Sequence, residues 1–288
     1  MQIIDGAVGA LRGKIGDALF ATVAGADADA EHSRIHDSRG ERWFDEDSVI
    51  RRVHGDSAMF IGGIRALLLQ SLHPLPMAAV AQFSDYRHDP WGRLQRTAGF
   101  IAETTYATAE DSQRAVDRVR RIHEHVSGIA PDGREFHAND PHLLLWVHIA
   151  EIDSFLRCHQ RYGAHPLTEA ECDSYVAETA KIATALGSET PPTTRAELDA
   201  ALDDFRPELR GNAQSRAAAR FLVWNPPVRL YARGAYGLLA AAAVAELPVW
   251  TRRQLWLPFL PITEATLVQL GGRGMVNTIR WAMQPEAA

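Results

Sequence analysis

Two neighbouring histidines are the first candidates for chemistry, because an imidazole can act as a general base or as a metal ligand. The stretch "RRIHEHVSG" places His123 and His125 near the end of a predicted helix over residues 109–128. At about 100° per residue the two side chains point about 200° apart, and His123 shares the apolar face of Val116 and Val119. The pattern predicts that His123 points into the core and that His125 points out.

A second inward imidazole is predicted on the next helix, over residues 141–161. His148 falls on one face of that helix with Leu145 and Ile152. Burying a polar group without a partner costs on the order of 1 to 3 kcal/mol. His148 and His123 therefore each need a side-chain partner or a metal. An ordinary core histidine, bonded to another side chain, is the alternative interpretation of either residue.

A pair of arginines forms the third candidate. In "RLQRT", Arg93, Arg96 and Thr97 share one helical face at spacing i, i+3 and i+4. Two guanidiniums this close repel each other unless they share an anion, such as a carboxylate side chain or an acidic ligand. Ordinary solvent exposure is the alternative, since arginines usually lie at the surface.

Several other catalytic motifs are missing from the sequence. No histidine has a glutamate three residues before it, as the Glu-x-x-His motif of helical di-iron sites requires. The pair His123-Glu124 is not followed by the second histidine of the zinc motif His-Glu-x-x-His. There is no nucleophile elbow and no phosphate loop, and "GGRG" at 271–274 lacks the spacing of a dinucleotide fingerprint. Cys158 lies in mid-helix and is interpreted as a small core hydrophobe.

Composition excludes further classes of protein. The net charge is −6 without a dense basic run, which argues against nucleic acid as a partner. The two cysteines form no Cys-x-x-Cys pair, which fits a reducing compartment. Charged residues interrupt the N-terminal apolar pattern, and the longest apolar stretch, "GLLAAAAVAEL", is about half the length needed to cross a bilayer. We therefore expect a cytoplasmic protein with no transmembrane segment.

The hydrophobic period predicts an all-α fold, a single helical bundle, since no useful strand pattern and no repeat occur. Residues 3–23 predict an amphipathic helix, which either docks on the body or contacts a membrane surface or a partner. A polar linker follows, so that residues 1–44 form an N-terminal extension of a helical domain over 45–288.

Side chains that start and stop helices mark the bounds of this domain. Pro74 should end one helix, and Asp89 with Pro90 should begin the next. Thr108 resembles the cap of the helix that runs until Gly128, and Thr168 begins another that ends near Gly187.

An inward histidine, an arginine-rich face and a large apolar core suit a haem pocket, in which a histidine holds the iron and arginines meet the propionates or oppose the iron. Helical bundles with inward histidines are common, so these residues alone do not exclude a helical protein that binds no cofactor.

Four ordered motifs resemble the MpaB-type oxygenase family, which includes the latex-clearing rubber oxygenases. They are the run from Asp45 to Thr97, "VRRIHEHVSG", "FHANDPHLLLWVHIAEIDS" and "PLTEAECDSYVAE". The likeness extends from about Asp45 to the C-terminus and is strongest over 47–178. It implies an all-helical fold that holds haem b, with one histidine as axial ligand and dioxygen as oxidant.

The resemblance also implies roles for the candidate residues. His123 takes the place of the axial iron ligand, and His148 that of the second histidine, beside the ligand or at a propionate. Arg93 and Thr97 match the family's Arg-x-x-Lys-Thr pattern, with Arg93 pairing with a propionate or carboxylate. Arg96 replaces the lysine of rubber oxygenases. Because arginine stays charged and is a poor ligand, Arg96 and Thr97 would line the distal side without ligating iron, which argues against rubber as substrate.

The function implied is oxygenation of a small apolar or lipid-like molecule with dioxygen or peroxide. A haem carrier or sensor without turnover is the first alternative, and a helical binding protein without cofactor is the second. A homo-oligomer is compatible with the sequence.

Overall fold

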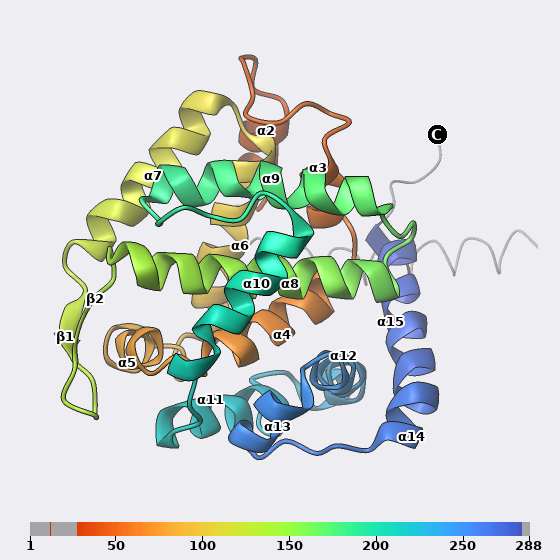
Figure 1. Cartoon of the computed structure of the whole chain (residues 1–288). Coiled ribbons are helices and arrows are strands. Elements are labelled where there is room, and N and C mark those ends of the chain that lie inside the picture. The colour runs from red at the N-terminus through yellow and green to blue at the C-terminus, as the bar shows by residue number, and fades with distance from the viewer. Residues whose placement is uncertain (1–11, 13–27, 284–288) are drawn as a thin grey trace, which may run out of the picture.

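A computed structural model describes Arg12 and residues 28–283 of the chain (Figure 1). The predicted all-α fold is confirmed, since the described residues form helices apart from one small antiparallel hairpin. The helix predicted over 3–23 lies outside the described residues, except for Arg12.

The first half of the chain forms α2 (Ala28–His36), α3 (Val49–His54), α4 (Met59–Gln70), α5 (Pro74–Phe83), α6 (Pro90–Tyr106), α7 (Ala109–His123), β1 (Ser127–Ile129) and β2 (Glu135–His137). The second half forms α8 (Pro141–Tyr162), α9 (Glu169–Leu186), α10 (Arg195–Phe205), the 3-10 turn η1 (Arg206–Glu208), α11 (Ala213–Val223), the 3-10 turn η2 (Leu230–Ala232), α12 (Arg233–Ala245), α13 (Val249–Leu255), α14 (Pro261–Thr263), the π-helical turn η3 (Glu264–Val268) and α15 (Gln269–Met283). Among the described residues no single helix is long and apolar enough to cross a membrane, and α4 and α5 pass that test only as a pair bent by 106°.

The predicted helix starts are confirmed by side-chain caps. The Asp89 carboxylate accepts a hydrogen bond from the backbone N–H of Gly92 at the start of α6. Thr108 caps α7 in the same way, and Thr168 with Glu171 forms a complete capping box on α9. Gly187 ends α9 in the left-handed conformation, with φ of 97°.

The prediction for the end of α7 is wrong by five residues. The helix ends at His123 instead of continuing to Gly128, because the chain turns into the hairpin β1–β2, in which Gly128 pairs with Phe136. Phe136 is buried beside Leu143 and anchors this hairpin. Its strands have only three residues each, which is too short for an alternating hydrophobic pattern to predict them from the sequence. The hairpin brings the chain back past the end of α7.

The predicted polar linker also differs from the structure, because α2 forms within it. Ile35 is buried, and the Arg34 guanidinium makes an ion pair of 2.6 Å with Glu103 of α6. A second ion pair joins Arg34 to Asp111 at 3.7 Å. Polar contacts thus contribute much of what holds this helix, and its hydrophobic period is too weak to predict it.

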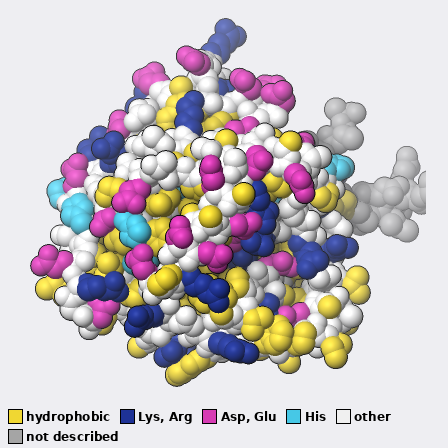
Figure 2. Space-filling model, in the orientation of Figure 1, with side chains coloured by type: hydrophobic (Ala, Val, Ile, Leu, Met, Phe, Trp, Pro, Cys, Tyr) yellow, Lys and Arg dark blue, Asp and Glu magenta, His cyan; other side chains and the backbone are white. Residues whose placement is uncertain are grey.

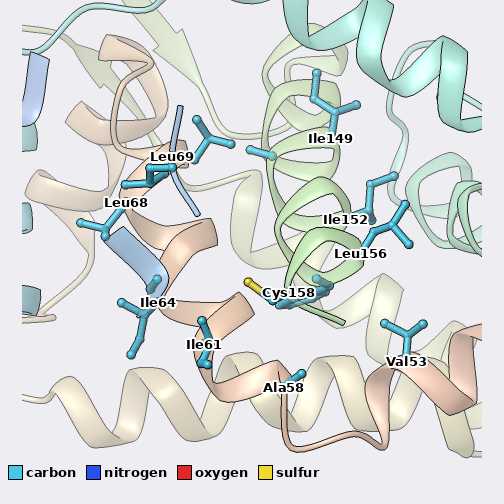
Figure 3. Packing of buried hydrophobic residues seen from close by; sticks show 14 of the residues in the cluster. Val53, Ala58, Ile61, Ile64, Leu68, Leu69, Ile149, Ile152, Leu156 and Cys158 are labelled. Atoms are coloured by element: carbon cyan, nitrogen blue, oxygen red, sulfur yellow. The ribbon is translucent and has the colours of Figure 1, made fainter. Parts of the chain in front are cut away.

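The core is built on the packing of α4 against α8, with Ile61, Leu156 and the predicted inward position Ile152 buried between neighbouring helices (Figure 3). Cys158 is buried and unpaired in this core, as predicted. The Arg65 guanidinium crosses the same interface. It pairs with Asp153 at 2.9 Å, donates to Ser154 Oγ at 2.6 Å and donates to the backbone oxygen of Glu246, beyond the end of α12, at 3.0 Å.

Replacing Gly62 with alanine is expected to destabilise the fold by about 1 to 3 kcal/mol. A Cβ at Gly62 would lie 2.9 Å from Phe155 Cδ1 and 3.3 Å from Phe155 Cα, so α4 and α8 would have to move apart. Gly63→Ala is the matched control, because its Cβ meets nothing within 4 Å. The control should gain up to about 1 kcal/mol from helix propensity. Equal urea midpoints for the two variants would contradict this account of the interface.

The remaining helices surround this core. The pair α6–α7 packs together, and α3 and α9 each contact both this pair and α8. In Figure 1, α9 lies above α8, the helices α11 to α13 lie below, and α15 runs along the right-hand side. His123 therefore belongs to the α6–α7 pair, whereas His148 belongs to the α4–α8 pair.

Candidate functional site

His123 is the last residue of α7 and is half-buried, whereas His125 is exposed, so the predicted difference between them is confirmed. Its Nδ1 atom is buried and has no hydrogen-bond partner. Burial lowers the pKa of His123, and the nearby Asn139 side chain opposes that shift. The imidazole is therefore neutral at neutral pH, which is the form that binds a metal.

Asn139 is held beside His123 by the return of the hairpin. The backbone N–H of Ala138 donates to the Val126 oxygen at 2.9 Å, and Asn139 Nδ2 donates to the Arg120 oxygen at 3.0 Å. The Oδ1 atom of Asn139 is buried without a partner, like Nδ1 of His123. These two atoms are a complementary acceptor and donor. Asn139 lies within the motif "FHAND", but its type alone did not single it out.

His148 has the second unsatisfied imidazole. Its Nε2 atom is buried without a hydrogen-bond partner, and burial lowers its pKa to about 4. His54 shows the contrast, because its two ring nitrogens contact Thr105 Oγ1 at 2.8 Å and Tyr175 Oη at 3.2 Å. His54 is thus an ordinary core histidine, and His148 lacks the partners that would make it one.

One other described histidine has a buried nitrogen without a partner. This residue, His159, is nevertheless held by its Nε2 atom against the His165 oxygen at 3.1 Å. No such bond holds His148 or His123 among the described residues, which distinguishes these two from His159.

Glu151 lies one turn after His148 on α8 and was not predicted as a site residue. Its side chain forms no ion pair with any residue that the structure describes, and burial raises its pKa to about 7, opposed in part by Gln70. The sequence contains a signal for Glu151, because an acid three residues after an inward histidine lies on the same face of the helix. Its lack of a basic partner depends on neighbouring helices, which the spacing does not reveal.

The arginine face of α6 is divided between the interior and the surface. Arg93 is half-buried, donates to Ser84 Oγ, and has no carboxylate partner among the described residues. Burial lowers its pKa, which Tyr86 opposes and Arg96 reinforces. Arg96 is 66% exposed and pairs with Asp89 at 3.2 Å. The anion expected to join the two guanidiniums is therefore not a shared side chain.

Thr97 is exposed, and its hydroxyl donates to the backbone oxygen of Arg93 at 3.1 Å, one turn earlier in α6. The structure thus keeps Arg93 and Thr97 in contact. In the described part of the chain, no hydrogen bond or ion pair joins this face to His123 or to His148.

These residues fit a haem better than a bare metal ion. The part of the chain that the structure describes has no group of three histidine, cysteine or acidic side chains placed to hold a metal ion. A haem iron needs only one protein ligand, because the porphyrin supplies four. The unsatisfied imidazoles of His123 and His148, and the Arg93 guanidinium without a carboxylate partner among the described residues, are groups of the kinds that would ligate a haem iron and pair with its propionates.

The comparison with protein families agrees with the motifs. The family described as "ER-bound oxygenase mpaB/B'/Rubber oxygenase, catalytic domain" matches residues 51–281, which include every candidate residue above. No curated protein and no solved structure matches the chain significantly. The chain therefore belongs to the MpaB and rubber oxygenase family, and this membership supports an oxygenase-type function.

Proposed function

We propose that the chain is a haem b-dependent oxygenase that acts with dioxygen or peroxide on a small apolar or lipid-like substrate. The observation that carries this proposal is the half-buried, neutral imidazole of His123, whose buried Nδ1 atom has no hydrogen-bond partner among the described residues and has the Asn139 side chain nearby. With haem bound, Nδ1–H would donate to Asn139 Oδ1, and the lone pair of Nε2 would be available to the iron. Bound haem would supply the iron centre at which the oxidant is activated.

The other residues bind and orient in this proposal. Arg93 would hold a propionate, because its half-buried guanidinium has no carboxylate partner within the described chain. His148 would accept or donate a hydrogen bond at Nε2, toward the second propionate or the pocket wall. Its pKa of about 4 keeps the ring neutral, whereas the pKa of Glu151, about 7, lets that carboxyl hold or release a proton at neutral pH.

Arg96 and Thr97 would form the solvent-facing edge of the pocket. Arg96 remains charged and can orient the oxidant or an acidic substrate by hydrogen bonding once it leaves Asp89. The Thr97 hydroxyl, now bonded to the Arg93 oxygen, is the neighbouring donor.

The absorption spectrum of the purified chain tests the proposal. Protein from cells supplied with a haem precursor should show a strong Soret band that shifts on reduction with dithionite. Oxygen consumption with a reductant and candidate alkenes then separates an oxygenase from a haem carrier. A chain that stays colourless after reconstitution with haem would overturn the proposal in favour of a helical binding protein.

Asn139→Ala is expected to weaken haem affinity by about 10- to 100-fold, since partners of a ligating histidine typically contribute that much. Asn139→Asp should retain affinity, because a carboxylate also accepts from Nδ1–H. The matched control is Asn225→Ala, at an exposed asparagine. Haem transfer to apomyoglobin measures the dissociation rate, and equal rates for Asn139→Ala and wild type would refute the role of Asn139.

A further inference from the structure

Exposed large apolar side chains concentrate near the C-terminal end of the described chain. Leu230, Tyr231 and Ile262 are 81%, 82% and 82% exposed. With Leu238, Leu267 and Leu270 they define what we call the C-terminal apolar surface. Folded monomers rarely expose contiguous apolar area of this kind unless it binds something.

The elements that carry this surface are adjacent. η2 leads into α12, and α12 packs against both η3 and α15. A Cβ at Gly271 would lie 2.9 Å from Leu238 Cδ2, so Leu238 of α12 rests on the start of α15. Figure 2 shows hydrophobic side chains along the lower right edge of the molecule, where Figure 1 places α14 and the start of α15.

On η2, α12, α14, η3 and α15, which carry the C-terminal apolar surface, the exposed charges without an ion-pair partner among the described residues are all positive. The acidic residues between 224 and 283 are Glu246 and Glu264, and each is neutralised within the fold, by Arg161 at 3.1 Å and by Arg252 at 2.7 Å. Four exposed arginines in the same stretch have no carboxylate partner among the described residues: Arg229, Arg233, Arg253 and Arg273. This face is therefore cationic, although the net charge of the whole chain is −6.

We propose that the C-terminal apolar surface docks on an anionic phospholipid bilayer. A bilayer offers hydrocarbon for the leucine and isoleucine side chains and anionic headgroups for the arginines, with Tyr231 suited to the boundary between them. A second copy of the chain fits less well, because a two-fold contact through this face would bring like charges together. Peripheral docking agrees with the cytoplasmic location expected from the sequence and does not depend on haem.

Arg12, the one described residue before α2, lies away from this face. The Arg12 guanidinium lies 6.0 Å from the Trp281 ring centroid, near the end of α15 that is distant from Leu267 and Leu270. This contact holds Arg12 at the opposite end of the helix.

Co-sedimentation of the full chain with vesicles tests the proposal. The vesicles contain equal parts of phosphatidylcholine and phosphatidylglycerol, and pure phosphatidylcholine vesicles are the comparison. The variant carries Leu230→Ser, Ile262→Ser and Leu267→Ser. The matched control carries Ile122→Ser in α7 and Ile129→Ser in β1. These side chains are 57% and 62% exposed and do not belong to the C-terminal apolar surface. Circular dichroism verifies that all variants are folded.

The wild type and the control should bind the mixed vesicles, more weakly at high salt and on pure phosphatidylcholine, because exposed arginines are screened. The triple variant should partition at least about tenfold less, since each leucine-sized side chain withdrawn from hydrocarbon weakens binding. Absence of wild-type binding, or binding that survives in the triple variant, would overturn the proposal. A wild-type dimer that becomes monomeric in the triple variant, with neither binding vesicles, would instead identify an interface between copies.

Discussion

His123→Ala is expected to abolish stoichiometric haem binding, so that the Soret band of the purified protein disappears. Alanine removes the half-buried imidazole at the end of α7, whereas the other histidine of this turn, His125, is exposed. Loss of an axial ligand removes the bond that fixes haem in the fold. The measurement is the ratio of Soret to protein absorbance after reconstitution with excess haem and gel filtration.

Two variants make the result for His123 interpretable. His125→Ala should retain full haem, because its side chain points into solvent. His148→Ala should retain haem with a shifted spectrum or a faster loss, since His148 is assigned a role beside the cofactor and not on the iron. Retention of full haem by His123→Ala, or its loss in His148→Ala alone, would move the axial ligand away from His123.

Glu151→Gln is expected to raise the free energy of unfolding by about 3 kcal/mol at a pH above 7. Burial raises the pKa of Glu151 to about 7 from an ordinary value of 4.5, so the folded chain binds a proton that the unfolded chain has lost between these values. Stability therefore falls as pH rises from 4.5 through about 7. Glutamine is neutral throughout and removes this loss.

Urea unfolding of wild type and Glu151→Gln across this range measures the difference. The acid side of the profile should remain in the variant. Burial lowers the pKa of His148 to about 4, so the unfolded chain binds more protons below pH 6.5 and stability falls there. Glu135→Gln, at an exposed acid of β2, is the matched control and should follow wild type. A Glu151→Gln profile parallel to wild type would show that Glu151 is not buried as the structure has it.

Most of the fold could be predicted, because helix starts are encoded locally. Asp89, Thr108 and Thr168 each cap the helix that directly follows, so a few adjacent residues contain the whole signal. The errors lie in segments whose structure depends on contacts with residues that are distant in the sequence. The hairpin is fixed by burial of Phe136 against residues of other elements, and α2 is fixed by contacts with α6, neither of which appears in the local period.

The sequence predicted which of the two neighbouring histidines points inward, but not which residues surround the candidate side chains. Helical period correctly distinguished His123 from His125, because both lie near the end of one helix and differ only in angle. Asn139 and Glu151 were not found, because their importance lies in what surrounds them: an unsatisfied amide oxygen beside His123, and a carboxyl without a basic neighbour. The division of α6 also required the third dimension, since Ser84 and Asp89 decide which arginine turns inward.

The Arg65 guanidinium has a consequence for how the chain unfolds. Its three contacts join α4, α8 and the residue that follows α12, which lie far apart in the sequence. A chain shortened before α12 would lose one of the three acceptors of a fully buried cation, and a buried charge with an incomplete set of partners is destabilising. We therefore expect α4, α8 and α12 to unfold together as one cooperative unit, and we expect a fragment that ends before α12 to be less stable than the full chain.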